Sequence, residues 1–368
     1  MMRLKTNAGE DFFINTAYNK LPDNITVNTL KNSKSLDFHL TLANYSPTPL
    51  IRLKDLGRSL GIRDLYIKDE ASRFGLNAFK GLGASYAIHQ ILISKPHIKT
   101  FCTATDGNHG RAVAWSAKRE GKESRIFVPV YTSQSQIKAI EEEGAIVTKI
   151  DANYDETCEY ALKTGQRNGW EPVQDTFWEG YEETSAQIMA GYLTQFQELE
   201  NTIHTLPVPG IDIVFLQAGV GSWAASAIWY YINRYGEQRP QIVIVEPSES
   251  DGILESFKKG YRTQPVGTFK TIMEGLNCGI PSKSAWGIIK NGTDAILRIE
   301  DSHTLEAMKI LFAPEGNDTK VIAGESGAAG LAGLVRILED PEFECLKRHL
   351  GLTERSKVLL FNTEGKTT

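Results

Sequence analysis

The sequence predicts an α/β protein built around mainly parallel β-sheets. Short runs rich in β-branched residues alternate with longer stretches of helical periodicity. Several helical stretches end at a glycine, as helices commonly do, among them those before Gly121, Gly144 and Gly169. The run at 211–216 is almost continuously apolar, which is typical of a parallel strand covered on both faces. Alternation of this kind favours helices layered on parallel sheets.

Each expected element follows from its local pattern. The expected strands cover residues 65–68, 100–105, 125–130, 146–150, 211–217, 241–246 and 357–361. The expected helices cover residues 108–120, 134–143, 154–168, 181–200, 222–235, 303–313 and 326–338. The helix that begins at residue 222 is apolar around most of its circumference, so we expect it to be deeply packed. Residues 202–210 and 258–269 are expected to form loops.

Composition and charge exclude several classes of protein. The chain has 368 residues, of which 41% are apolar and 23% charged, so it is not expected to be disordered. With a net charge of −5, it has no basic excess for binding nucleic acid. The sequence has no uninterrupted apolar run of about 18 residues, so no membrane span is predicted. The N-terminus does not resemble a secretory signal. A cytoplasmic protein is therefore expected.

The cysteines predict neither a metal site nor a disulfide framework. None of them forms a CxxC pair, so zinc binding is not indicated and free thiols are favoured. We expect no bound metal. The four positions are Cys102, Cys158, Cys278 and Cys345.

A glycine-rich turn at 217–222, Gln-Ala-Gly-Val-Gly-Ser, follows the apolar strand and opens a helix. Gly219 and Gly221 allow backbone N–H groups to approach an anion, and the helix N-terminus adds partial positive charge. Ser222 is either an N-cap or a phosphate donor. A tight turn without a ligand explains the pattern equally well. A nicotinamide site is a weaker alternative, because the third glycine of the dinucleotide motif is missing, although Glu246 ends the next strand where a ribose acid is expected.

Lys80 lies at a predicted junction between a loop and a helix, directly after Phe79. An apolar neighbour and a helix N-terminus disfavour the ammonium form, which is how a Schiff-base lysine becomes nucleophilic. Judged from this context alone, an ordinary surface lysine is the favoured interpretation.

A polar turn at 103–111 also ends a strand and begins a helix. Its successive N–H groups are suited to a carboxylate, Asn108 to a ring oxygen, and Asp106 to acid–base chemistry. His109 is better explained as a structural hydrogen-bonding residue. Thr363, on the final strand end, indicates no function by itself.

Together the four motifs resemble the tryptophan-synthase-β-like (fold type II) family of pyridoxal-phosphate enzymes. Within that family, the blocks at 73–80 (Arg-Phe-Gly-Leu-Asn-Ala-Phe-Lys) and 105–111 (Thr-Asp-Gly-Asn-His-Gly-Arg) are most similar to the diaminopropionate ammonia-lyases, as are 181–192 and 273–278. The resemblance implies two α/β domains with the cofactor in the cleft between them. It assigns residues 1–99 and 179–368 to a large domain and 100–178 to a small mobile one. It also implies a homodimer.

The resemblance also implies residue roles. Lys80 would bind pyridoxal phosphate as a Schiff base and later carry a proton, and Thr363 would face the pyridine nitrogen and leave it largely unprotonated. Asn108 would bind the phenolic oxygen. The phosphate would lie on Gly219, Val220, Gly221 and Ser222, and the substrate carboxylate on Asp106, Gly107, Asn108 and His109.

Asp106 indicates the substrate. Related serine and threonine dehydratases carry a serine there, whereas a carboxylate suits a second ammonium group and can remove a Cα proton from the face opposite Lys80. The implied reaction is elimination from D- and L-2,3-diaminopropionate to pyruvate and two ammonia. A serine or threonine dehydratase and a non-catalytic binding protein remain as alternatives. Gly81 and Ala84 depart from the family pattern, and the chain stops at Thr368, where a further tail is usual.

Overall fold

The structure is a computed structural model that describes residues 9–105, 107–175, 181–203 and 210–366. The chain divides into two compact units. Unit 1 comprises Met1–Pro22, Thr48–Ala71 and Phe196–Thr367, and unit 2 comprises Asp23–Pro47 and Ser72–Gln195.

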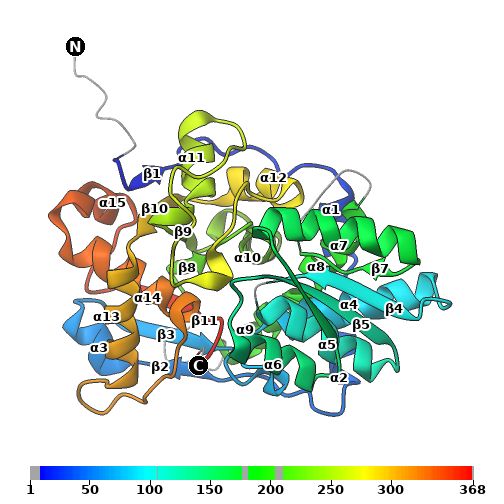
Figure 1. Ribbon diagram of the computed structural model, residues 1–368. Helices are drawn as coiled ribbons and strands as arrows, with labels where there is room; N and C mark the ends of the chain where they lie inside the picture. Colours follow the sequence, from blue (N-terminus) through cyan, green and yellow to red (C-terminus); the bar gives the residue numbers. More distant parts are fainter. Residues whose placement is uncertain (1–8, 106, 176–180, 204–209, 367–368) are drawn as a thin grey trace. The chain divides into compact units, whose positions relative to one another are not determined.

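Unit 1 is built on one mixed β-sheet (Figure 1). Its inner strands β10, β9, β8, β11 and β3 are parallel, while β1 and β2 pair antiparallel at the two edges. The carboxyl ends of the parallel strands therefore lie at one edge, where sites of open α/β sheets form. In spatial order the strands are β1 (Phe12–Ile14), β10 (Ala295–Ile299), β9 (Gln241–Pro247), β8 (Ile213–Gln217), β11 (Lys357–Asn362), β3 (Asp64–Asp69) and β2 (Leu50–Arg52).

Helix α14 packs directly on the sheet of unit 1, against β8, β9, β10 and β11. Small residues allow this approach: a Cβ atom on Gly333 would lie 2.7 Å from a methyl carbon of Val245. The helices of the unit are α3 (Lys54–Ser59), α9 (Leu193–Ile203, which begins in unit 2), α10 (Ser222–Tyr235), α11 (Gly252–Lys259), α12 (Lys283–Gly292), α13 (Asp301–Phe312), α14 (Glu325–Glu339) and α15 (Glu344–His349). Its short 3₁₀ helices are η2 (Gly236–Gln238), η3 (Ser248–Ser250), η4 (Glu274–Leu276) and η5 (Pro341–Phe343).

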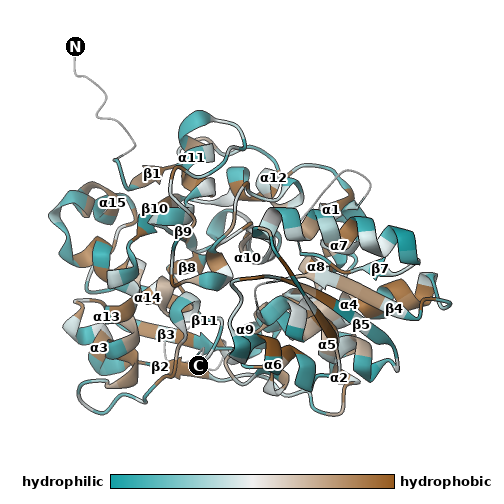
Figure 2. Cartoon of the chain, viewed as in Figure 1, coloured by the Kyte–Doolittle hydropathy of each residue, from teal (hydrophilic) through white to brown (hydrophobic). Residues whose placement is uncertain are grey.

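Unit 2 has a parallel sheet in the order β6-β5-β4-β7. Helices α5 and α7 pack on its central strands, and α4 packs on both α5 and α8. In Figure 2, α7 is coloured mostly as hydrophilic, whereas β4 and β5 are more hydrophobic. The strands are β4 (Thr100–Ala104), β5 (Glu123–Pro129), β6 (Ile146–Ile150) and β7 (Glu171–Pro172). The helices are α1 (Ile25–Lys31), α2 (Ser35–Leu40), η1 (Arg73–Gly75), α4 (Lys80–Ser94), α5 (Asn108–Arg119), α6 (Gln134–Glu142), α7 (Tyr154–Asn168) and α8 (Glu182–Gly191).

The α/β class with mainly parallel sheets is confirmed, and each expected strand is present within a few residues of its predicted bounds. The helix expected over 181–200 is wrong as one element, because it breaks at Tyr192 into α8 and α9. The break coincides with a close crossing of α4 and α8. A Cβ atom on Gly191 would lie 2.4 Å from the Leu82 carbonyl oxygen, and one on Gly83 would lie 2.5 Å from the Tyr192 ring.

Unit 2 contains more of the chain than residues 100–178, the segment expected to form the smaller domain. It also contains α4 and α8, since these helices pack on each other and α4 packs on α5. That residues 100–178 move as a small domain stays a prediction. Among the helices that the structure describes, none has the length and apolar character to cross a membrane.

Candidate active site

Lys80 is the first residue of α4, directly after its N-cap residue Phe79. The turn that leads into α4 uses left-handed backbone at Gly75 (φ +75°) and Asn77 (φ +62°), residue types that tolerate this conformation. The Lys80 side chain is 20% exposed, and its Nζ donates a hydrogen bond to Asp175 Oδ2 at 2.6 Å. The junction expected at Lys80 is therefore confirmed, and the amine has a buried counter-charge that the sequence analysis missed.

Asp175 follows β7 on an irregular segment, and its side chain is 9% exposed. Burial by itself would raise the pKa of this carboxyl. The Lys80 ammonium and His109 act in the opposite direction and hold the pKa of Asp175 well below its ordinary value. Asp175 is thus a carboxylate at neutral pH. No local pattern marks it, because it lies in no glycine-rich turn and β7 is only 2 residues long.

Two neighbours hold the segment around Asp175 in place. The Gln174 side chain accepts hydrogen bonds from Thr103 Oγ1 at 2.7 Å and from the Ala104 N–H at 2.9 Å. Its amide also donates to the Ala104 carbonyl at 3.0 Å. The Tyr181 hydroxyl accepts from the Gln174 N–H at 2.6 Å. The backbone before Asp175 is therefore tied to the end of β4, which positions the carboxylate opposite Lys80.

His109 is buried in α5, and its Nε2 lies 2.8 Å from the Val173 carbonyl oxygen. A carbonyl only accepts, so Nε2 carries a hydrogen. Burial lowers the pKa of His109, and the neighbouring Lys80 adds to this against the opposing effect of Asp175. Neutral His109 then presents a lone pair at Nδ1, which is buried without a hydrogen-bond partner in the described chain and lies 3.8 Å from Asp175 Oδ2. The expectation of a structural, hydrogen-bonding histidine agrees with the Val173 contact.

The predicted carboxylate turn is described only in part, since Asp106 lies outside the described residues. Asn108 is the first residue of α5, and Gly107 is its N-cap. Thr105 Oγ1 accepts the N–H groups of Gly107 at 2.9 Å and Gly110 at 3.1 Å. The Gly107 N–H therefore already has a protein partner.

The glycine-rich turn in unit 1 links β8 to α10, as expected. Gly221 is the N-cap of α10 with φ +89°, and in the described part of the chain no side-chain hydrogen bond caps this terminus. A Cβ atom there would lie 2.5 Å from Ile289 Cδ1, and one on Gly219 would lie 2.7 Å from Cys278 Sγ. The Val220 carbonyl accepts the Ser282 N–H at 2.8 Å, which fixes the turn. Ser222 is buried as the first residue of the helix.

Thr363 directly follows β11 and is 4% exposed. Its Oγ1 accepts a hydrogen bond from Gln217 Nε2 at 3.0 Å. Within unit 1, Gln217 thereby links the glycine-rich turn to Thr363. Lys80, His109 and Asp175 form the corresponding group within unit 2. Asp175 and Gln217 are the two site residues that the sequence analysis did not find.

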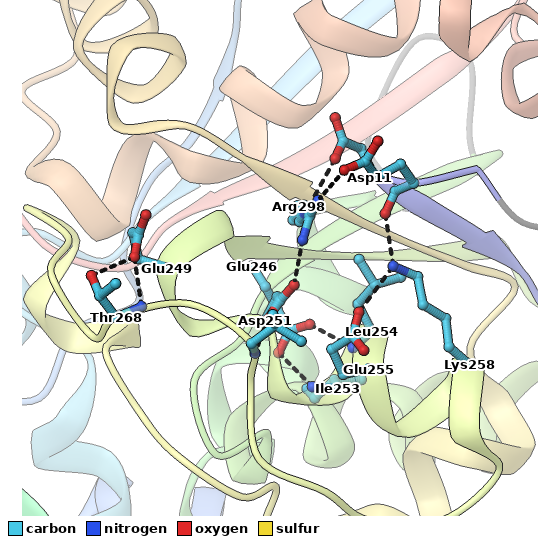
Figure 3. A network of polar contacts seen from close by, with 12 residues as sticks. Asp11, Glu246, Glu249, Asp251, Ile253, Leu254, Glu255, Lys258, Thr268 and Arg298 are labelled. Atoms are coloured by element: carbon cyan, nitrogen blue, oxygen red, sulfur yellow. Dashed lines mark hydrogen bonds and ion pairs between the residues drawn. The ribbon is translucent and has the colours of Figure 1, made fainter.

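Glu246, the candidate ribose acid of the nicotinamide alternative, has another role. Its two carboxyl oxygens accept the N–H groups of Ile253 and Leu254, each at 2.8 Å, and it is fully buried (Figure 3). Next to it, Arg298 pairs with Asp251 at 2.9 Å. Because Glu246 caps the start of α11, it has no free oxygen for a ribose, and the nicotinamide alternative loses its acidic residue.

The described residues fit pyridoxal phosphate. Unit 2 offers the primary amine of Lys80 with a buried counter-charge. Such an amine can form a Schiff base with a carbonyl group. Unit 1 offers a helix N-terminus without a side-chain cap, at two glycines where no Cβ fits, which suits a phosphate. It also offers the hydroxyl of Thr363 for a ring nitrogen. Among the described residues, no cluster of His, Cys, Asp or Glu is arranged to hold a metal ion.

Comparison with known proteins gives consistent matches. The family described as pyridoxal-phosphate dependent enzyme matches residues 41–347. Diaminopropionate ammonia-lyase of Escherichia coli is 39% identical over 347 residues, which cover 90% of this chain and 87% of that protein.

Two crystal structures of the Escherichia coli enzyme are also similar to this chain. The one in complex with an aminoacrylate-PLP azomethine reaction intermediate has a TM-score of 0.88 and 37% identity, covering 96% of this chain and 93% of that one. The complex with D-serine has the same TM-score of 0.88, with 36% identity and the same coverage of 96% and 93%.

Proposed function

Because the chain belongs to the diaminopropionate ammonia-lyase family of pyridoxal-phosphate-dependent enzymes, we propose that it eliminates ammonia from 2,3-diaminopropionate. Both the D and the L isomer are substrates, and the products are pyruvate and two ammonia. The observation that carries the proposal is the contact of 2.6 Å between Lys80 Nζ and the buried Asp175 carboxylate. This contact gives the amine that binds the cofactor a fixed position and a fixed counter-charge.

The chemistry that bound pyridoxal phosphate supplies is electron withdrawal from the substrate Cα. The turn from Gly219 to Ser222 would hold the phosphate through backbone N–H groups at the start of α10. Asn108 would bind the phenolic oxygen of the cofactor, and Thr363 would offer its hydroxyl to the pyridine nitrogen. Val220 contributes its backbone, since its carbonyl holds the turn on Ser282.

Lys80 holds the cofactor and then moves a proton at Nζ. When it takes the Cα proton it becomes an ammonium, and Asp175 stabilises that charge because its carboxylate stays ionised. Asp175 is also a suitable partner for the second ammonium group of a diamino acid. Serine carries a neutral hydroxyl group in place of the second ammonium group, so it gains no such ion pair. This difference supports the diamino substrate over serine.

Asp106 lies outside the described residues, and its role remains a proposal from the resemblance. It takes the Cα proton of the isomer that presents this proton on the face opposite Lys80. Together with Gly107, Asn108 and His109 it forms the turn that binds the substrate carboxylate. Asp106→Asn should then lower turnover of the D isomer much more than turnover of the L isomer, and equal losses would count against two separate bases.

We also propose a homodimer that works in the cytoplasm. The support for both is the family resemblance. Light scattering of the purified protein measures the mass in solution, and a monomeric active enzyme would contradict the dimer.

The test of the function is pyruvate release, followed with a lactate-dehydrogenase assay on D-diaminopropionate, L-diaminopropionate and L-serine. Both diaminopropionate isomers should yield pyruvate faster than serine. Pyruvate from serine alone would support the dehydratase, and pyruvate from none of the three would support a non-catalytic protein. Lys80→Ala should lose the visible absorbance of the purified protein, whereas a band that persists and is reduced by borohydride would place the cofactor on another lysine.

A further inference from the structure

Gln217 is the last residue of β8, and its side-chain amide is buried, at 3% exposure. Its Nε2 has four acceptors, on α14, on β11 and just after β11. It lies 2.8 Å from the Phe361 carbonyl oxygen on β11 and 3.0 Å from Thr363 Oγ1. On α14 it lies 3.0 Å from the Ser326 carbonyl oxygen and 3.5 Å from that of Gly327. The amide therefore joins β8, β11 and the start of α14 at the point where Thr363 leaves the sheet.

Only one orientation of this amide is compatible with its surroundings. The carbonyl oxygens of Ser326 and Phe361 accept hydrogen bonds and cannot donate them, so the group that faces them must be the NH₂. Turning the amide over would place Oε1 against both carbonyl oxygens. In the described chain Oε1 is itself buried without a partner. A buried acceptor without a hydrogen bond destabilises the folded state. The fold accepts this cost at Oε1 because the contacts of the NH₂ group fix the orientation of the amide.

This orientation determines the role of the Thr363 hydroxyl. An amide NH₂ donates and does not accept, so Thr363 Oγ1 must be the acceptor in this contact. The hydroxyl hydrogen of Thr363 then points elsewhere. Among the residues that the structure describes, none accepts this hydrogen, and Thr363 is 4% exposed. Thr363 Oγ1 thus accepts from Gln217 and keeps its own hydrogen for a group bound beside it.

We infer that Gln217 is a positioning residue that makes the Thr363 hydroxyl donate to the pyridine nitrogen of the cofactor and so keeps that nitrogen unprotonated. The inference rests on the proposed function, in which Thr363 faces this nitrogen. A threonine hydroxyl that rotates freely can donate to a bare ring nitrogen or accept from a protonated one. Gln217 disfavours the second possibility, because one lone pair of Oγ1 already faces the NH₂ group. If Oγ1 also accepted from the ring, its own hydrogen would have no acceptor among the described residues.

Direct observation of the ring nitrogen tests the inference. The holoenzyme is reconstituted with pyridoxal phosphate labelled with ¹⁵N in the ring, and the ¹⁵N resonance reports protonation without any turnover. In the wild type we expect the resonance of an unprotonated nitrogen. Gln217→Glu replaces the donor with an acceptor, so Thr363 donates to the new carboxylate and offers a lone pair to the ring. Its resonance should move to the position of a protonated nitrogen.

Gln217→Met removes the donor without adding charge and serves if the glutamate variant does not fold. It frees the hydroxyl to accept, so the ring nitrogen should become titratable, and its resonance should move as the pH is lowered while the wild-type resonance stays. Gln195→Met is the matched control, because Gln195 is a fully buried glutamine. Among the described residues its Nε2 bonds only to the Tyr192 carbonyl, at 3.3 Å. Its ring-nitrogen resonance should equal that of the wild type.

The same replacements in a Thr363→Val background separate positioning from general structural effects. Without the hydroxyl, Gln217→Met should cause no further change in the resonance. A ring nitrogen that stays unprotonated in both Gln217 variants overturns the inference, as does an effect of equal size in the Thr363→Val background. Failure of the proposed function looks different, because in that case the wild type releases no pyruvate from diaminopropionate whatever the state of the nitrogen.

Discussion

The Lys80 ammonium and the Asp175 carboxylate form a hydrogen-bonded ion pair, with 2.6 Å between Nζ and Oδ2. The two residues are 95 positions apart in the chain, and both are mostly buried. A buried charge without its partner is strongly disfavoured. The pair therefore couples the charge state of the amine that binds the cofactor to a residue from a different part of unit 2.

The first prediction concerns this pair. Asp175→Asn keeps the size of the side chain but removes the charge that stabilises protonated Lys80. We expect kcat on diaminopropionate to fall by about 10²- to 10⁴-fold, the range for loss of an acid–base function. Steady-state pyruvate assays measure the change.

Glu171→Gln is the control, because Glu171 forms an ion pair of similar length, 2.7 Å, with Lys95. Unlike Lys80, Lys95 is exposed. Its activity should equal that of the wild type. An Asp175→Asn enzyme with wild-type kcat would contradict the role of Asp175.

The second prediction concerns the glycine-rich turn. Gly221→Ala adds a Cβ atom 2.5 Å from Ile289 Cδ1 at a residue with φ +89°. Gly236→Ala is matched to it, because Gly236 has φ +57° but no atom within 4 Å of the added carbon. Both should lose stability through backbone strain, and Gly221→Ala should lose about 1–3 kcal/mol more because of the overpacking.

Urea unfolding compares the two variants, and absorbance after dialysis measures the pyridoxal phosphate that each retains. Gly221→Ala alone should release the cofactor. Equal retention in both variants would argue against phosphate binding at this turn.

The third prediction concerns Glu364, next to Thr363. Burial raises its pKa to about 7, against the hydrogen bond that Oε1 accepts from the Ser326 N–H at 3.0 Å. The folded chain therefore holds this proton more tightly than the unfolded chain does, and the carboxyl contributes stability at low pH. That contribution is lost as the pH rises from the ordinary value of 4.5 through about 7.

Glu364→Gln keeps an oxygen acceptor for Ser326 but cannot ionise. Its free energy of unfolding should exceed that of the wild type above neutral pH, by about 3 kcal/mol from the size of the pKa change, and the gain should disappear in acid. Glu354→Gln, at an exposed position, should show no such gain. A gain that does not depend on pH would rule out titration of Glu364 as its cause.

The fourth prediction has the opposite sign. Burial lowers the pKa of His109, with Lys80 acting in the same direction. The unfolded chain therefore binds the proton more tightly, and stability falls as the pH drops below the ordinary value of 6.5. His109→Gln still offers an N–H to the Val173 carbonyl and cannot be protonated.

Thermal unfolding at a series of pH values should show a shallower loss of stability in acid for His109→Gln than for the wild type. His349→Gln, on the exposed side of α15, serves as the control and should follow the wild type. If His109→Gln and the wild type lose stability in parallel, His109 is not the group that titrates.

The elements that could be predicted have a local cause. Helices α7 and α10 occur at the expected bounds, because Gly169 and Gly221 adopt the left-handed conformations at their ends. The strands that were not expected are β1, β2, β7 and β10. Three of these lie at sheet edges and have only 2 or 3 residues, too few to form a readable pattern. The break at Tyr192 was missed because it depends on contact between α4 and α8, not on the residues around it.

The candidate site divides in the same way. Lys80, the turn at Gly219 to Ser222 and Thr363 are recognisable as motifs, because each is contiguous and each depends on a strand end, a helix start or a glycine. The contacts of Asp175 with Lys80 and of Gln217 with Thr363 join residues 95 and 146 positions apart. Such pairs form only when the tertiary structure brings distant parts of the chain together. The fold therefore decides that Asp175 is the counter-charge of Lys80 and that the Gln217 amide points its NH₂ group at Thr363.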